Sequence, residues 1–289
     1  MKAEDIKTIG VCGAGTMGAG IVQLAAASGY NVKVIDVQDA FLARGMSIIT
    51  KNLGRLLAKE KISQADNDAI LGRISTSTDA ASLAEADFVI EAILEEVTAK
   101  KDLFDKLEKV CRPEVIFATN TSSISVTQLA SLTGRPDRVV GMHFFNPVPV
   151  MKLVEIIPAL QTAPEAVEVT MALTAKLGKT PVACKDTPSF IVNRILIPMI
   201  IDACRVYESG VASATDIDTA MKLGSNMPMG PLELADFVGI DIVYHIGNML
   251  FEYSKEARFN PPDLMRNMVM AGWLGRKSGK GFYDYAERT

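Results

Sequence analysis

The chain lacks the clustered cysteine and histidine residues from which disulfide frameworks and zinc sites are built. It has 289 residues but only four cysteines and two histidines, and no CxxC pair is present. Such sites normally use closely spaced cysteine and histidine residues. We therefore expect no metal ion, and buried thiols in a reducing compartment, the cytoplasm, at these scattered positions: Cys12, Cys111, Cys184 and Cys204.

Long apolar runs and an excess of one charge are also missing. The longest apolar stretch, around residues 195–201, contains Pro198 and is far shorter than the roughly 20 residues of a membrane span. Residues 1–5 lack the charged-then-apolar pattern of a signal peptide. A net charge of −4 argues against nucleic acid as the main partner. We expect a soluble protein without a membrane or nucleic-acid partner.

What the chain does contain is enough apolar material for one large or two modest domains, at 48% of its residues. Strand-like and helix-like stretches alternate up to about residue 185, and the remainder reads as almost entirely helical. We predict an α/β Rossmann-like N-terminal domain at residues 1–186, which binds a dinucleotide. An all-α C-terminal domain at residues 187–289 follows, suited to a substrate wall or a dimer interface.

A glycine-rich loop follows the first predicted strand and leads into a helix. Gly13, Gly15 and Gly18 form a G-x-G-x-x-G between the strand at residues 6–12 and the helix at residues 19–28. In this setting the first glycine permits a tight turn, the second lets a pyrophosphate approach the backbone, and the third allows close packing of helix on strand. The complete unit predicts dinucleotide binding.

The strand after that helix, at residues 31–36, ends in Asp36. A carboxylate at this position accepts hydrogen bonds from the 2′ and 3′ hydroxyls of the adenosine ribose and repels a 2′-phosphate. We therefore expect NAD rather than NADP as the cofactor. The alternative is a solvated acid at a strand end.

A histidine and a carboxylate occupy two β-rich runs that are joined by a proline-rich turn. The first run stops at His143, Pro147 and Pro149 force the chain to turn, and the second run, at residues 152–157, contains Glu155. If the two runs lie side by side, the imidazole and the carboxylate meet near the connection and form a dyad. The alternative is a structural histidine at a strand end.

Ser122 lies in a cluster of small polar residues after the strand predicted at residues 115–119, at the edge where α/β sheets bind ligands. The local pattern favours a different role, as a turn or N-cap residue for a helix at residues 126–132. Lys51 and Arg55 lie on the basic side of an amphipathic helix predicted at residues 41–62. That side is either merely solvated or binds an anion.

In the helical region, Thr187 and Pro188 look like the cap and first turn of a long helix that reaches about Ser209. Asn193 lies early in this apolar helix, as a buried hydrogen-bonding group or a substrate contact. His245 lies on another apolar helix and is expected to be structural. The basic, glycine-rich segment at residues 272–285 either folds back on a phosphate or merely ends the domain.

Seven stretches in this order make the chain similar to a known family: GAGTMGAGIVQLAAASGYNV, VIEAI, ATNTSSISV, HFFNPVPVMKLVEII, CKDTPSFIVNRI, GPLELADFVGID and GRKSGKGFYDY. It resembles the L-3-hydroxyacyl-CoA dehydrogenases over about residues 6–285, and most closely the shorter members that act on 3-hydroxybutyryl-CoA. The resemblance implies reversible NAD-dependent oxidation at C3 of an acyl-CoA, in fatty acid and butanoate metabolism, by a homodimer.

The resemblance also implies roles for single residues. It makes His143 the catalytic acid and base and Glu155 its partner, and it places Ser122 and Asn193 at the substrate oxygen. Further contacts with NAD or the active site are implied at Met17, Ala92, Glu96, Lys100, Asn120, Ser122 and Asn146.

Lys51 and Arg55 match basic coenzyme A contacts of the family, and Arg55 stands where relatives often have lysine. Two rival functions remain open at this point. One is a related dehydrogenase of a free hydroxy acid or sugar acid, which would not need this basic pair. The other is a non-catalytic, crystallin-like structural protein, which need not retain the histidine and its carboxylate partner.

Overall fold

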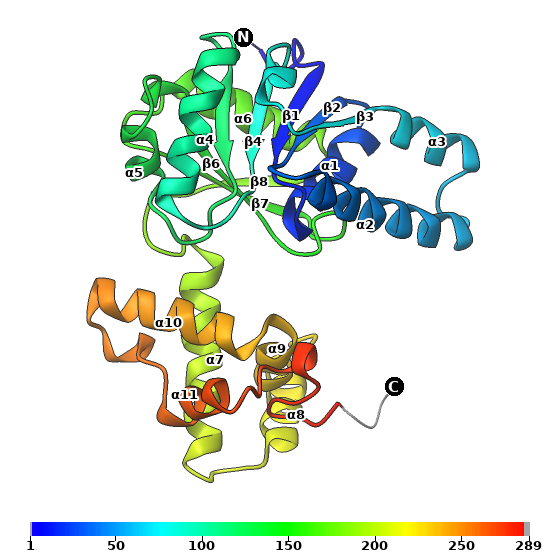
Figure 1. Ribbon diagram of the computed structural model, residues 1–289. Helices are drawn as coiled ribbons and strands as arrows, with labels where there is room; N and C mark the ends of the chain where they lie inside the picture. The colour runs from blue at the N-terminus through cyan, green and yellow to red at the C-terminus, as the bar shows by residue number, and fades with distance from the viewer. Residues whose placement is uncertain (1, 286–289) are drawn as a thin grey trace. The chain divides into compact units, whose positions relative to one another are not determined.

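The computed structural model describes residues 2–285 and divides the chain into two compact units (Figure 1). The first unit ends at Thr187 and the second begins at Pro188, one residue after the boundary expected from the sequence. Each unit has its own apolar core.

The first unit is built on one eight-stranded sheet with the order β3-β2-β1-β4-β5-β6-β7-β8. The six strands from β3 to β6 are parallel, β7 runs antiparallel to β6, and β8 is parallel to β7. The strands are β1 (Thr8–Cys12), β2 (Asn31–Ile35), β3 (Ile74–Ser77), β4 (Phe88–Glu91), β5 (Ile116–Thr119), β6 (Val139–Phe144), β7 (Leu153–Pro158) and β8 (Thr180–Ala183).

Helices cover both faces of this sheet, which explains why its central strands are apolar almost without alternation. One face packs against three helices, α1 (Thr16–Ala27), α2 (Asp39–Ala58) and α6 (Pro164–Lys176), in a single apolar cluster. On the other face, Phe104 of α4 (Val97–Val110) stacks on Phe117 of β5. The remaining helices of the unit are α3 (Gln64–Gly72), α5 (Val126–Ser131), η1 (Ala80–Leu83) and η2 (Pro136–Arg138).

The pleat of the sheet decides which side chains share the second face. Along β5 and β6 the residues in the α1, α2 and α6 cluster alternate with residues outside it, as side chains of a strand point to opposite faces. Glu91, Thr119, His143 and Glu155 fall outside that cluster and are buried. Four polar side chains therefore lie within the sheet on the side opposite α1.

The second unit is helical, and its core includes Ile200, Leu232, Val243 and Phe259. Its elements are α7 (Val192–Glu208), α8 (Ala214–Gly224), α9 (Pro231–Val238), α10 (Ile240–Ser254), η3 (Ala257–Phe259), α11 (Asp263–Met270) and η4 (Arg276–Ser278). Within residues 2–285 no single helix has the length and hydropathy to cross a membrane; α9 and α10 reach them only as a pair bent by 98°.

Two helix boundaries predicted from the sequence are wrong. The helix expected from Thr187 begins at Val192, because Ser189 and Phe190 adopt left-handed φ values of 63° and 53°, outside the helical region. The amphipathic helix expected to continue to residue 62 ends at Ala58, and Glu60 then has a φ of 54°. The helices α3 and α6 and the strand β8 were not predicted from the sequence.

The C-terminal segment folds back onto its own unit. Asp236 accepts hydrogen bonds from the backbone amides of Phe282 (2.9 Å) and Tyr283 (3.0 Å), and Gly281 lies so close to Asp236 that a side chain there would overlap it. Lys277 forms an ion pair with Asp241 at 2.6 Å. These contacts hold the segment against its own unit.

Candidate active site

The glycine-rich loop has the close contacts that its spacing predicts. Gly13 has a φ of 101°, and a side chain there would overlap the carbonyl of Ala92; one at Gly18 would overlap the carbonyl of Gly13. At Gly15, in contrast, no described atom lies within 4 Å of the position a side chain would take. The open space lies at the N-terminus of α1, where free amides and the helix dipole favour a diphosphate.

Asp36 follows β2 and lies directly beside this loop. One of its oxygens accepts a hydrogen bond from the Ala14 amide and the other from the Val37 amide, both at 2.7 Å. A carboxylate has about four lone-pair positions, so each oxygen retains acceptor capacity for a ribose hydroxyl. Asp36 and the glycine-rich loop therefore fit an adenosine diphosphate group together.

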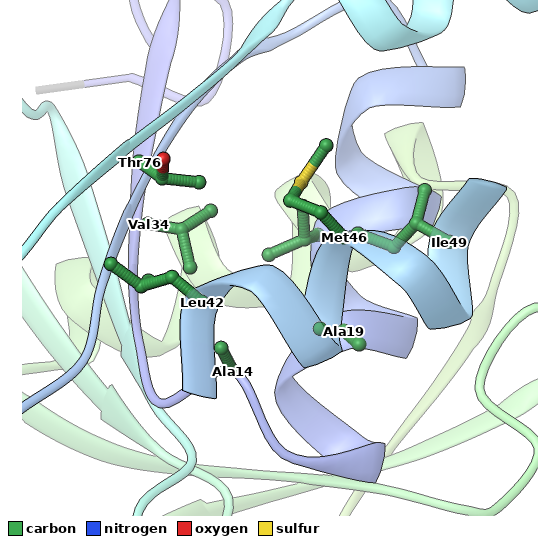
Figure 2. Close-up of a pocket in the computed structure, with 9 residues that line it drawn as sticks. Ala14, Ala19, Val34, Leu42, Met46, Ile49 and Thr76 are labelled. Carbon is green, nitrogen blue, oxygen red and sulfur yellow. The ribbon is translucent and has the colours of Figure 1, made fainter. Parts of the chain in front are cut away.

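A small apolar pocket marks where α2 packs against the glycine-rich loop (Figure 2). A side chain at Gly45 of α2 would press within 2.6 Å of the Ala14 carbonyl, so the helix approaches the loop backbone closely. This packing fixes α2, with the exposed Lys51 and Arg55 one turn apart, relative to the loop. The pocket is lined by Ala14, Ala19, Val22, Val34, Leu42, Gly45, Met46, Ile49 and Thr76.

His143 and Glu155 are direct cross-strand partners in the β6 and β7 ladder, as the sequence predicted if the two runs lie side by side. Their Nδ1 and Oε2 atoms are 2.7 Å apart, and the side chains are 7% and 0% exposed. A carboxylate only accepts, so Nδ1 carries the proton and Nε2 carries the basic lone pair of the neutral ring. The phenyl ring of Phe145 lies 4.6 Å from the imidazole, centroid to centroid.

Asn120 and Ser122 lie where β5 ends, beside the end of β6. The Asn120 Oδ1 atom accepts a hydrogen bond from the Phe144 amide at 2.8 Å and so joins the two strand ends. Ser122 is half-buried in the loop that follows. Its expected alternative as the N-cap of the next helix is wrong, because the hydroxyl of Ser125 accepts from the Gln128 amide and caps α5.

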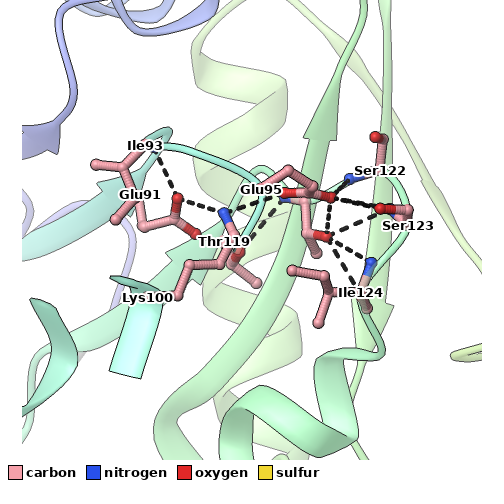
Figure 3. A network of polar contacts seen from close by, with 9 residues as sticks. Glu91, Ile93, Glu95, Lys100, Thr119, Ser122, Ser123 and Ile124 are labelled. Atoms are coloured by element: carbon pink, nitrogen blue, oxygen red, sulfur yellow. Dashed lines mark hydrogen bonds and ion pairs between the residues drawn. The ribbon is translucent and has the colours of Figure 1, made fainter. Parts of the chain in front are cut away.

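Behind this loop lies an ionic network that was not predicted from the sequence; its Glu91 and Lys100 are buried, whereas Glu95 is exposed (Figure 3). Lys100 Nζ lies 2.5 Å from Glu91 and 3.2 Å from Glu95. The neighbouring Glu96 takes the N-cap position of α4 but makes no side-chain cap, and it is exposed. Glu95, rather than Glu96, is therefore the acid that contacts Lys100; the available signal was a carboxylate, Glu91, ending an otherwise apolar strand.

The connection between β6 and β7, with the exposed Asn146, is held by a second residue that sequence reasoning missed. Lys179 Nζ donates hydrogen bonds to the carbonyls of Val148 (2.6 Å) and Met151 (2.7 Å). Burial lowers the pKa of this lysine. Val148 packs against Gly20 of α1, where a side chain would overlap it. No sequence signal distinguished Lys179 from a surface lysine.

The other predicted residues lie outside this group. Met17 is half-buried in the first turn of α1 and packs against the core of the first unit. Asn193 is half-buried in the first turn of α7, in the second unit, and its place at the substrate oxygen stays a prediction. The same holds for the expected contacts of Lys51 and Arg55 with coenzyme A.

Two family models match the chain in succession. The model described as "3-hydroxyacyl-CoA dehydrogenase, NAD binding domain" matches residues 8–187, and "3-hydroxyacyl-CoA dehydrogenase, C-terminal domain" matches residues 190–285. The chain belongs to the 3-hydroxyacyl-CoA dehydrogenase family. The predicted family, the fold class and an NAD-dependent dehydrogenase as the enzyme class are confirmed.

Individual relatives agree over nearly their whole length. The chain is 49% identical to a probable 3-hydroxybutyryl-CoA dehydrogenase of Deinococcus radiodurans, over 96% of this chain and 99% of the relative. A probable 3-hydroxybutyryl-CoA dehydrogenase of Bacillus subtilis is 47% identical over 99% of both chains. The crystal structure of (S)-3-hydroxybutyryl-CoA dehydrogenase PaaH1 from Ralstonia eutropha has a TM-score of 0.94 and 46% identity, covering 98% of this chain and 100% of that one.

Proposed function

We propose that this enzyme transfers hydride reversibly between NAD(H) and C3 of a short-chain (S)-3-hydroxyacyl-CoA, with 3-hydroxybutyryl-CoA and acetoacetyl-CoA as the reacting pair. The observation that carries the proposal is the buried His143 and Glu155 pair at the end of β6, in the same unit as a loop that fits a dinucleotide. The names of the relatives support the substrate.

His143 moves the proton. Oxidation of a secondary alcohol requires a base for its hydroxyl proton, and a positioned imidazole typically contributes about 10²–10⁴-fold. Nε2 takes this proton, while Glu155, hydrogen-bonded at Nδ1, stabilises the resulting imidazolium. Bound NAD supplies the hydride acceptor. In reverse, the imidazolium protonates the ketone oxygen, and Ser122 and Asn193 polarise that oxygen as hydrogen-bond donors.

The remaining predicted residues bind the cofactor and the substrate. Gly13, Gly15 and Gly18 receive the diphosphate and Asp36 the adenosine ribose. Further contacts with the cofactor or the active site come from Met17, Ala92, Lys100, Asn120 and Asn146. Lys51 and Arg55, one turn apart and exposed on α2, bind the coenzyme A phosphates. Glu96, exposed at the N-cap position of α4, is a further proposed contact with the cofactor or the active site, and Glu95 contacts Lys100 beside it.

Replacing the histidine tests the mechanism. His143→Ala should lose at least about 100-fold in kcat for NADH oxidation with acetoacetyl-CoA. NADH binding, measured by fluorescence titration, should stay unchanged because the cofactor loop is intact. His245→Ala, an exposed histidine on α10, is the matched control and should retain full activity. Near-normal activity of the His143 variant would refute the proposal.

The substrate assignment is tested with 3-hydroxybutyryl-CoA, a longer 3-hydroxyacyl-CoA and free 3-hydroxybutyrate. Arg55→Ala should raise KM for the thioesters and leave any turnover of the free acid unchanged. Efficient use of the free acid alone would instead support the related hydroxy-acid dehydrogenase. An inactive protein with all of these substrates would support the structural, crystallin-like alternative.

Cofactor choice, assembly and location have separate tests. Asp36→Ala should weaken the binding of NADH more than that of NADPH, since the lost carboxylate both binds the ribose hydroxyls and repels a 2′-phosphate.

The homodimer is proposed through the helical unit, and light scattering at micromolar concentration should give twice the chain mass of 31.1 kDa. The cysteines at residues 12, 111, 184 and 204 are free thiols, which supports the cytoplasm.

A further inference from the structure

Glu91 is a charged residue enclosed at the centre of the sheet. It ends β4, pairs with Cys12 of β1 and Thr119 of β5 in the strand ladder, and is 0% exposed. Its Oε2 accepts a hydrogen bond from the Thr119 hydroxyl at 2.6 Å, and Oε1 accepts from the Ile93 amide at 2.8 Å and from Lys100 at 2.5 Å. Both oxygens are thus satisfied, as burial of an ionised carboxylate requires.

Lys100 links Glu91 to a second carboxylate, that of Glu95. Its side chain is 1% exposed and its ammonium lies between Glu91 and Glu95. An isolated ammonium is expensive to bury, and removing one partner of a buried ion pair leaves the other uncompensated. The carboxylate of Glu91 therefore compensates the buried positive charge of Lys100 and helps to hold its ammonium beside Glu95.

Glu95 binds the loop that carries Ser122 through several hydrogen bonds (Figure 3). One oxygen of Glu95 accepts hydrogen bonds from the Thr121 hydroxyl (2.6 Å), the Ser122 amide (2.9 Å), and the Ser123 amide (3.1 Å) and hydroxyl (2.9 Å). Burial raises the pKa of Glu95, but Lys100 and these donors outweigh it, so its pKa lies below the usual value. An ionised carboxylate therefore fixes the backbone at Ser122.

We propose that Glu91 is a positioning residue for Ser122, acting through Lys100 and Glu95. The proposal rests on the proposed function of Ser122 at the substrate oxygen. Glu91 itself has no contact with the reacting atoms. It holds Lys100, Lys100 holds Glu95, and Glu95 sets the loop from which the Ser122 hydroxyl reaches the substrate. A buried ion pair with only a structural role would instead affect stability alone.

The first test is Glu91→Gln, which has the same shape but removes the charge facing Lys100. Its oxygen accepts from Ile93 and Lys100, and its amide group donates to the Thr119 hydroxyl, which then acts as the acceptor. Displacing a substrate-positioning group by about 1 Å costs up to about 100-fold in rate, so kcat should fall by about 10- to 100-fold. This kcat is measured at saturating NADH, because Lys100 is itself a proposed cofactor contact and its displacement changes KM for NADH separately.

The matched control is Asp87→Asn, at the opposite end of the same strand. Asp87 accepts hydrogen bonds from the amides of Lys7 and Thr8 and pairs with Arg112. Its loss should lower the melting temperature without changing kcat more than about twofold, since distant, independent sites act separately. An equal fall in kcat for both variants would show that general destabilisation explains the result.

A double-mutant cycle with Ser122→Ala decides between positioning and a structural role. If Glu91 acts through Ser122, Glu91→Gln should cost less than about threefold in kcat once the hydroxyl is gone, because coupled residues are non-additive. Undiminished, additive losses would overturn the inference. Normal activity of Ser122→Ala alone would instead overturn the proposed role of Ser122, so the two failures are distinguishable.

A milder variant covers the case in which Glu91→Gln does not fold. Thr119→Val is nearly isosteric and removes only the hydroxyl, which donates to Glu91 and accepts from the Thr121 amide at 3.4 Å. It should lower kcat by a few-fold, and that loss should disappear in the Ser122→Ala background. An unchanged kcat for Thr119→Val, or a loss that persists in that background, counts against positioning.

Discussion

The two units bury charged side chains in different ways. In the first unit, Glu91 and His143 lie near the carboxyl ends of β4 and β6 and face other ionisable side chains, Lys100 and Glu155. In the second unit, the buried Asp218 and Asp236 receive uncharged donors only, from backbone amides and tyrosine hydroxyls, in the hydrogen bonds that the structure resolves within residues 188–285. Ionic pairs thus lie at the edge of the sheet where the active site is proposed, whereas the acids of the helical unit hold its chain together.

Asp218 illustrates the second use. Its carboxylate accepts hydrogen bonds from the amides of Leu232 and Glu233, both at 2.8 Å, which are unpaired donors in the first turn of α9. A negative charge at a helix N-terminus is also favoured by the helix dipole. The Tyr283 hydroxyl adds a third donor at 2.6 Å, so one aspartate joins α8, α9 and the C-terminal segment.

The comparison predicts that removing charge at the edge of the sheet where the active site is proposed affects rate more than stability. Glu155→Gln should lower kcat by at least about 100-fold, since the imidazolium formed at His143 loses its compensating carboxylate. The similar shape of glutamine should keep the melting temperature within a few degrees. Steady-state kinetics and calorimetry on the same sample measure both, and a normal kcat would remove Glu155 from the mechanism.

Lys179 lies between the two categories, since it is charged but binds only backbone carbonyls in the contacts described above. Lys179→Met should lower the free energy of unfolding by about 1–3 kcal/mol, because the buried carbonyl of Val148 and the part-buried carbonyl of Met151 lose their donor. Hydrogen exchange should accelerate most at residues 147–151, whose carbonyls it holds. The control is Lys176→Met, which replaces an exposed lysine at the end of α6. Equal effects of both variants would show that Lys179 does not hold the connection between β6 and β7.

In the second unit the expected effect is on stability alone. Tyr283→Phe removes the hydroxyl that donates to Asp218 and leaves the two amide donors in place. A loss of about 1–2 kcal/mol in urea unfolding is expected, with kcat within about twofold. Tyr253→Phe, on the exposed side of α10, should change neither quantity. A large fall in kcat for the Tyr283 variant would contradict a purely stabilising role for the acids of the second unit.

The smallest expected effect is a pH dependence at Glu95. Because its folded pKa lies below the ordinary 4.5, the ionised form contributes stability above about pH 4.5, and this contribution is lost as the pH falls through the folded pKa. The melting temperatures of the unmodified chain and Glu95→Gln should therefore differ at pH 7 and converge toward pH 3. A constant difference across this range would show that the charge of Glu95 is not what stabilises the loop.

Local chemistry explains why some elements were predictable. Gly13 requires a left-handed φ, and Pro147 and Pro149 end a strand whatever surrounds them. The β-rich runs on either side of that turn were close enough in sequence for the pairing of His143 with Glu155 to be expected. Periodicity was likewise sufficient to predict a Rossmann-like unit followed by helices.

Burial and long-range hydrogen bonds were not predictable from the same patterns. Ser122 and Ser125 both look like helix caps, and only the fold decides that Ser125 caps α5 while Glu95 binds the Ser122 amide. Lys100 and Lys179 resemble surface lysines, yet both are buried. Lys179 binds carbonyls that are distant in sequence, whereas Lys100 meets Glu91 and Glu95 because the chain turns from β4 into α4.

The sequence by itself therefore determined the nucleotide-binding turn, the histidine and carboxylate pair and the family, because these depend on residue type and short spacing. Only the tertiary structure decided which buried charges support them. The energy of an ionisable group depends on the donors and charges that enclose it, and these come from strands and loops brought together by folding.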